Sequence, residues 1–137
     1  MPSWAPRPDA TIIAGATDVG LWVTKFLKPI APAIFTGHLG EMKRIALDND
    51  RLTIGAGASY SDCQTHLARH FPHLEAYWNR IAGWQVRNMG TLGGNIANGS
   101  PIGDTPPVLI ALGAEITLRH GERRRVIPLE DFFIAYG

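Results

Sequence analysis

Cysteine is nearly absent from this sequence. Its 137 residues contain a single cysteine, Cys63, which excludes an internal disulfide framework and a cysteine-bound iron–sulfur cluster within the chain. An excess of charge is absent as well, because 13 lysines and arginines are balanced by 12 aspartates and glutamates, for a formal net charge of +1. That balance argues against a protein that binds nucleic acid or a membrane surface.

Long hydrophobic stretches are also missing. No apolar run approaches the roughly 20 residues of a membrane-spanning helix, and the first ten residues, MPSWAPRPDA, hold no apolar core of a secretory signal. We therefore expect a cytoplasmic protein. With 45% hydrophobic and 18% charged residues, the composition is typical of a globular chain. The length suits one domain, which could consist of two small lobes.

Glycine, by contrast, is abundant and concentrated. Five glycines fall within residues 87–104, RNMGTLGGNIANGSPIGD, where nearly all side chains are short and neutral. Such a stretch is usually a surface loop, but Leu92, Ile96 and Ile102 are spaced through it, and a solvated linker has no use for them. Glycine lets a backbone approach a ligand closely, and successive N–H groups form anion sites. The segment therefore predicts a packed loop that presents its backbone to a ligand.

A second candidate loop covers residues 14–20, AGATDVG, between a predicted strand and a predicted helix. Backbone N–H groups at such a place attract phosphate. Taken alone, an ordinary capped turn is the favoured interpretation. Together with the glycine segment, the loop predicts a two-loop clamp on a pyrophosphate.

Hydrophobic periodicity and turn residues indicate the elements. They predict strands over residues 11–14 and 33–35 with a helix over residues 19–26 between them. They then predict a hairpin of residues 44–47 and 52–54, helices over 61–70, 74–82 and 105–112, and a hairpin of residues 115–119 and 123–127. The fold class is therefore α+β, with a small strand–helix–strand lobe in residues 1–50 and a lobe of antiparallel strands and helices in residues 51–137.

One alternative is a metal-binding module. Cys63, His66, His70 and His73 follow the pattern C-x2-H-x3-H-x2-H, and the first three share one face of a predicted helix, as zinc ligands could. We favour the polar side of an amphipathic helix instead. Pro72 breaks the helix before His73, and no second pair of ligands lies elsewhere.

Two further motifs are weaker still. Residues 55–60, GAGASY, imitate a dinucleotide fingerprint, but a lone G-x-G is weak evidence, and we interpret it as a strand end and turn. Four arginines, Arg119 and Arg123 to Arg125, cluster at the last predicted hairpin. They could grip a phosphate or a partner, although such charge more often protects a solvated edge strand.

The glycine segment carries a resemblance. Residues 85–114, QVRNMGTLGGNIANGSPIGDTPPVLIALGA, strongly resemble the FAD-binding region of the molybdenum hydroxylases, and most of all the small flavin subunits of the bacterial xanthine dehydrogenase type. The strand and turn IIAGATDVG, residues 12–20, resemble the first FAD loop of that family. The resemblance covers almost the whole chain. It implies a two-lobed FAD-binding domain.

The resemblance also implies a set of site residues. In the family FAD lies between the two lobes, with its pyrophosphate cradled by the backbone of two loops. By that likeness one wall is formed by Gly15, Ala16, Thr17, Asp18 and Val19. The other wall is formed by Thr91, Gly94, Asn95 and Asn98. Asp104 matches the acid that hydrogen-bonds the flavin nucleotide, and Ile81 falls where the family places an apolar residue near the isoalloxazine.

The function implied is that of a xanthine dehydrogenase-like enzyme. Electrons pass there from a molybdenum centre that hydroxylates a purine, through 2Fe–2S clusters, to FAD and then to NAD, with the molybdenum cofactor and the clusters on other domains or subunits. The cofactor performs the chemistry, so no acid–base catalyst is assigned here. Alternatives are a flavin subunit of carbon monoxide dehydrogenase or of an aromatic-CoA reductase, and a non-catalytic fragment. Complete flavin subunits continue past residues 132–137, so we expect a shortened module that is incomplete at its C-terminus.

Overall fold

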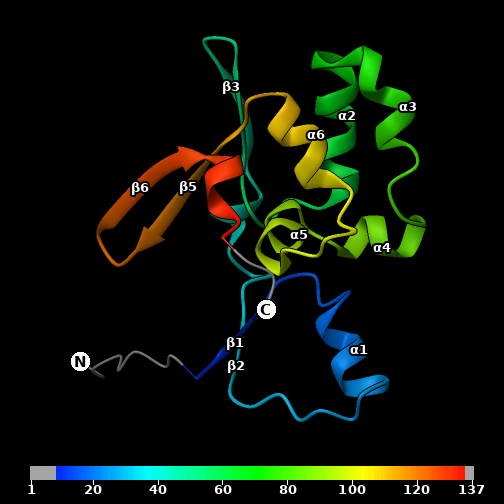
Figure 1. Ribbon diagram of the computed structural model, residues 1–137, viewed down its shortest axis with the longest axis vertical. Coiled ribbons are helices and arrows are strands. Elements are labelled where there is room, and N and C mark those ends of the chain that lie inside the picture. Colours follow the sequence, from blue (N-terminus) through cyan, green and yellow to red (C-terminus); the bar gives the residue numbers. More distant parts are fainter. Residues whose placement is uncertain (1–8, 135–137) are drawn as a thin grey trace.

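The computed structural model describes residues 9–134, and these form a smaller and a larger part (Figure 1). Strand β1 (Thr11–Ile13), helix α1 (Val19–Thr24) and strand β2 (Ala33–Phe35) make up the smaller part. The predicted strand–helix–strand unit and the α+β class are thus confirmed. Residues 1–8 and 135–137 lie outside the described part.

The smaller part is a parallel strand pair with a helical connection. Ile12 of β1 is in register with Ile34 of β2. Helix α1 is shorter than predicted and ends at Thr24. Leu27 has a φ of 52°, a left-handed conformation that cannot continue a helix, and it turns the chain toward Pro29.

Two antiparallel hairpins belong to the larger part. In the first, β3 (Ile45–Asp48) pairs with β4 (Arg51–Ile54) across a two-residue turn, whose residues Asn49 and Asp50 have φ of 46° and 63°. Positive φ at both positions is the signature of the turn that best matches the strand twist. In the second hairpin, β5 (Glu115–His120) pairs with β6 (Arg123–Pro128). Both predicted hairpins are confirmed within a residue or two at each end.

The first helix after residue 59 has a strong N-terminal cap. Helix α2 (Tyr60–His70) starts at a capping box in which Ser59 and Asp62 bond each other's backbone N–H groups. A short 3-10 turn (Pro72–Leu74) leads into α3 (Glu75–Trp78). The prediction of one helix over residues 74–82 is wrong in its second half, because α3 ends at Trp78. Ala82, with a φ of 55°, lies outside the helical region.

The glycine segment is largely helical, so the predicted loop is wrong over residues 92–98. Helix α4 (Trp84–Met89) is followed by α5 (Leu92–Asn98). The N–H of Gly94 donates to Oγ1 of Thr91 at 3.1 Å, which caps the start of α5. Gly99, with a φ of 60°, ends it. Leu92 and Ile96 are both buried at the i, i+4 spacing of one helix face.

The core lies in the larger part, among α2, α5 and α6 (Thr105–Ala111). Leu67 of α2 and Leu129 are each only 2% exposed, and Ile45 of β3 packs against the same cluster. The boundary between lobes near residue 50 stays a prediction. Within residues 9–134, no helix is both long and apolar enough to cross a membrane.

The candidate metal residues are spread over this core and its surface. Cys63 is buried within the hydrophobic cluster, His66 and His70 are half-buried, and His73 is exposed. Residues 9–134 contain no group of three or more His, Cys, Asp or Glu side chains that could hold a metal ion. Burial, helped by the charge of Asp62, raises the pKa of the Cys63 thiol to about 12.

This raised pKa predicts a loss of stability at alkaline pH. The pKa of the thiol rises from 9.0 to about 12 on folding. The protonated thiol therefore contributes fully to the free energy of unfolding below pH 9, and this contribution is lost as the pH rises toward 12. We expect the free energy of unfolding, measured with urea between about pH 7 and about pH 10, to fall above pH 9 more steeply in the unchanged protein than in Cys63→Ala. Equal pH dependence in the two proteins would show that the thiol ionises as easily in the folded chain as in the unfolded one.

Candidate functional site

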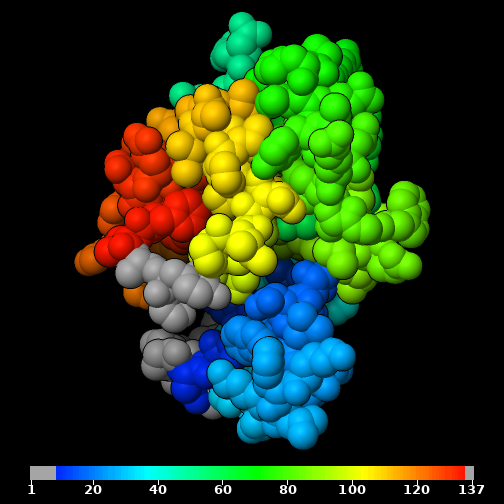
Figure 2. Space-filling view, turned by 45° about the vertical axis from the view of Figure 1, so that its right-hand side comes forward, coloured from blue at the N-terminus to red at the C-terminus, as the bar shows by residue number. Residues whose placement is uncertain are grey.

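Two backbone segments that are distant in sequence meet between the parts of the molecule. A Cβ atom on Gly15 would lie 1.8 Å from the carbonyl oxygen of Met89, at the end of α4. Only glycine permits such an approach. In Figure 2 the blue smaller part lies directly below the yellow residues around α5. The loop of residues 14–19, which comes first along the chain and is called the first loop below, is therefore held against the beginning of the glycine segment.

A third segment joins them from the end of β4. The N–H of Gly93 donates to the carbonyl oxygen of Ala56 and that of Leu92 to Ala58, both at 3.0 Å. A Cβ on Gly93 would lie 2.5 Å from the Cβ of Ala56. The predicted strand end and turn over residues 55–60 is confirmed. It also forms a wall of the site, which the sequence interpretation missed.

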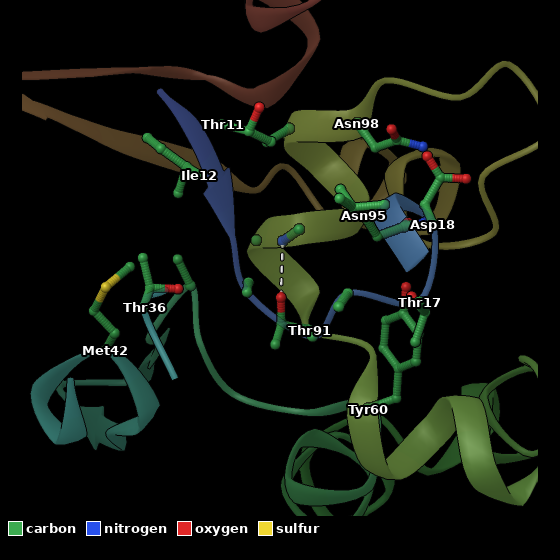
Figure 3. A pocket seen from close by; sticks show the side chains of 18 of the residues that line it. Thr11, Ile12, Thr17, Asp18, Thr36, Met42, Tyr60, Thr91, Asn95 and Asn98 are labelled. Atoms are coloured by element: carbon green, nitrogen blue, oxygen red, sulfur yellow. Dashed lines mark hydrogen bonds between the residues drawn. The ribbon is translucent and has the colours of Figure 1, made fainter. Parts of the chain in front are cut away.

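These three segments enclose a pocket of about 420 Å³ (Figure 3). The predicted residues that line it are Gly15, Ala16, Thr17, Asp18, Val19, Thr91, Gly94, Asn95 and Asn98. The lining residues that were not predicted are Thr11, Ile12, Ala14, Trp22, Thr36, Met42, Ala56, Tyr60, Gly93 and Ala97. In Figure 3, Tyr60, Thr17 and Asp18 lie to one side of Thr91, while Ile12, Thr36 and Met42 lie to the other.

Two predicted site residues lie outside this lining. Ile81 is 5% exposed and belongs to the core, where it borders a small cavity together with Tyr60 and Trp78. Asp104 is exposed, and its backbone carbonyl accepts a hydrogen bond from the Tyr77 hydroxyl at 2.5 Å. Burial raises the pKa of Tyr60 to about 12, with a further contribution from the charge of Asp104. Both residues therefore lie near the Tyr60 end of the pocket.

The first loop offers free donors to the pocket. The backbone N–H groups of Ala16, Thr17 and Asp18 donate to no group in residues 9–134. Ala16 has a φ of 58°, so the chain direction changes within this run. Successive N–H groups in such a mixed conformation form a concavity that binds anions.

The glycine segment, on the opposite wall of the pocket, offers side-chain donors instead of backbone donors. The N–H groups of Leu92, Gly93 and Gly94 are all satisfied within the protein, so the expected backbone clamp is one-sided. What remains on this side is the hydroxyl hydrogen of Thr91 and the side-chain amides of Asn95 and Asn98. The amide oxygen of Asn95 accepts a hydrogen bond from Thr105, which leaves the Asn95 amide nitrogen to donate to a ligand.

Charge is nearly absent from the lining. Asp18 is the only ionisable acid or base among the residues that line the described pocket, apart from the phenol of Tyr60. An anion would therefore be held by neutral N–H and O–H donors rather than by arginine or lysine. A ligand that is mostly uncharged, with a short anionic portion, suits this chemistry.

A comparison with protein families identifies the family of this chain. The model of the FAD binding domain in molybdopterin dehydrogenase matches residues 3–137. Among curated proteins, nicotinate hydroxylase of Emericella nidulans is 34% identical over 94% of this chain and 11% of its own length. The xanthine dehydrogenase FAD-binding subunit of Escherichia coli O157:H7 is 29% identical over 97% of this chain and 47% of its own length. The chain thus spans less than half of these relatives.

Solved structures share the fold. Carbon monoxide dehydrogenase from Hydrogenophaga pseudoflava superimposes with a TM-score of 0.83 and 30% identity, over 93% of this chain and 45% of that one. Quinoline 2-oxidoreductase from Pseudomonas putida 86 gives a TM-score of 0.84 and 26% identity over the same shares. The predicted similarity to the flavoprotein domain of molybdenum hydroxylases is confirmed at the level of the fold.

Proposed function

Since this chain belongs to the family of FAD-binding domains in molybdopterin dehydrogenases, we propose that its pocket binds FAD with the pyrophosphate on the first loop. The observation that carries the proposal is that the successive backbone N–H groups of Ala16, Thr17 and Asp18 have no acceptor within residues 9–134. Unpaired donors in a pocket favour an anionic ligand, and they bind it without the cost of breaking internal hydrogen bonds. Thr91 and Asn95 donate from the opposite wall.

The flavin half of the ligand is assigned to the Tyr60 end. Tyr60 lines the main pocket and also borders the small cavity that contains Ile81. Asp104 is near enough to influence the pKa of the Tyr60 phenol. Ile81 would then support the isoalloxazine from the core, and Asp104 would accept hydrogen bonds from the flavin nucleotide.

The wider role that we propose is electron transfer in a xanthine dehydrogenase-like oxidoreductase. When bound, FAD would supply the redox chemistry, with iron–sulfur clusters as the electron source and NAD as the acceptor. The chain's own residues bind and orient it. The clusters and the molybdenum cofactor would belong to an iron–sulfur domain and a molybdenum-binding subunit of the same enzyme. A flavin subunit of the carbon monoxide dehydrogenase type is the second candidate, favoured by the structural likeness to that enzyme.

Titration with FAD tests the proposal. We expect the chain to take up one FAD, seen as a change in the visible absorbance and fluorescence of the flavin. ADP should compete, because it carries the same pyrophosphate. Riboflavin, which has no phosphate, should not displace FAD at matched concentrations. Failure of both FAD and ADP to bind to a folded chain, checked by circular dichroism, would refute the assignment.

A further inference from the structure

The hairpin of β5 and β6 carries a concentration of positive charge that the pocket does not use. Residues 119–125 contain four arginines and one glutamate, a net charge of +3, whereas the whole chain carries only +1. The rest of the chain therefore has a net charge of −2. None of these residues lines the pocket or the small cavity described above. In Figure 1 the hairpin extends away from the helices, with its turn at the outer end.

One face of this hairpin is exposed along its length. Arg119 of β5 lies directly opposite Arg124 of β6, and Thr117 lies opposite Val126. Paired residues, and residues two apart on one strand, point to the same side of a sheet, so these four side chains share a face. All four residues are exposed, Val126 by 56%. The face formed by Thr117, Arg119, Arg124 and Val126 is called the arginine face below.

The two arginines of this face are available to a partner. Neither makes an ion pair with any of residues 9–134. The Nε atom of Arg119 donates to the carbonyl oxygen of Gly121 at 2.9 Å, which leaves its two terminal nitrogens to donate elsewhere. The acid on the same side of the hairpin, Glu115, accepts an ion-pair hydrogen bond from Arg51 at 2.5 Å. The arginine face is therefore positive, with its neighbouring acid already neutralised.

Protection of an exposed edge strand does not account for this arrangement. Lysine is the residue that most often serves that purpose, whereas all lysine or arginine positions within residues 119–125 are arginine. Like charges directly opposite each other in a sheet are destabilising, so the pair of Arg119 and Arg124 lowers the stability of the hairpin. A negatively charged partner would remove that repulsion.

We propose that the arginine face docks a carboxylate-rich surface of a partner protein. A guanidinium group binds a carboxylate through two parallel N–H donors, and protein interfaces are enriched in arginine around an apolar contact, which Val126 supplies here. A nucleic acid fits less well, because its phosphates would continue past the hairpin onto a chain whose remaining net charge is −2. Since the arginine face lies outside the pocket lining, this inference goes beyond the proposed function and does not depend on it.

Poly-L-glutamate is the probe, titrated into the full chain at low and at physiological ionic strength. The double variant Arg119→Gln/Arg124→Gln should bind it about tenfold more weakly than the unchanged protein. The matched control is Arg69→Gln/Arg80→Gln, which removes the same charge from two exposed arginines outside the hairpin. The control should bind nearly as the unchanged protein does. Circular dichroism checks the fold of each variant.

Thermal melting separates docking from a structural role. Because Arg124→Gln removes the repulsion with Arg119, it should melt no lower than the unchanged protein and still bind the probe more weakly. A lower melting temperature without weaker binding would overturn the proposal, as would equal losses of binding in the hairpin and control double variants. Self-association of the hairpin double variant in sedimentation, with unchanged binding, would show that the arginines only protect an edge.

Two further probes test the chemistry of the partner. The unchanged protein should bind poly-L-glutamate more tightly than duplex DNA or phosphatidylserine vesicles at matched charge concentration and physiological ionic strength. Tighter binding of either phosphate-bearing probe, lost in Arg119→Gln/Arg124→Gln, would assign the arginine face to phosphates and overturn the assignment to an acidic protein.

Discussion

Gly94→Val is expected to weaken FAD binding by about ten- to hundredfold while the chain stays folded. Gly94 lines the pocket in the first turn of α5. A Cβ there would lie 2.7 Å from Oγ1 of Thr91 and 3.9 Å from the Cβ of Ala14 on the first loop. The branched side chain of valine would fill the space between the two walls and displace the hydroxyl of Thr91, which the proposed site uses as a donor.

The fold should tolerate this change because the position is helical. Valine has a somewhat better helix propensity than glycine, which offsets part of the steric cost. Gly94→Ala adds one methyl group and should lose less affinity than Gly94→Val. The matched control is Gly20→Val, another glycine in a short helix, where a Cβ meets nothing within 4 Å and no pocket is lined.

FAD titration, with circular dichroism and thermal melting as controls for the fold, measures the effect. The ratio of the dissociation constants of Gly94→Val and Gly20→Val gives the part of the loss that is specific to the pocket. A folded Gly94→Val that binds FAD as tightly as Gly20→Val would remove α5 from the site.

Local patterns in the sequence predicted most of the elements, and their ends failed for identifiable reasons. The hairpin around Asn49 and Asp50 and the capped start of α2 were predicted because turn and cap residues act locally. Residues 92–98 were predicted as a loop because glycine and asparagine are poor helix formers. Tertiary contacts override that preference, since the buried pair Leu92 and Ile96 and the cap at Thr91 together stabilise α5.

The site could be predicted only in part, because some of its residues are brought to the pocket by contacts between segments that are distant in sequence. The predicted residues of the first loop and α5 do line one pocket, because each motif marks a place where backbones approach closely. Ala56 and Tyr60 were missed, since their role depends on two hydrogen bonds between segments 55–60 and 92–93 that no local pattern encodes. Trp22 was missed because one tryptophan on a short helix is indistinguishable in sequence from a core residue.

The most disruptive single methyl group in the molecule should be the one added by Gly15→Ala. A Cβ at this position would lie 1.8 Å from the carbonyl oxygen and 2.6 Å from the carbonyl carbon of Met89. Both are backbone atoms, so no side chain can rotate to relieve the clash. Overpacking of this kind costs about 1–3 kcal/mol and occasionally more, against a total stability of only about 5–15 kcal/mol for a domain of this type.

The clash can be relieved by moving the first loop away from α4, which would also open the pocket. We therefore expect Gly15→Ala to lower the free energy of unfolding by about 3 kcal/mol or more and to lose FAD binding together with it. Gly37→Ala, in the same part of the molecule but with open space around its Cβ, should change neither. Urea unfolding and FAD titration on both variants decide the matter. If Gly15→Ala were as stable as Gly37→Ala and bound FAD equally well, the first loop could not lie against the end of α4, and the pocket between the two parts would have to be built in another way.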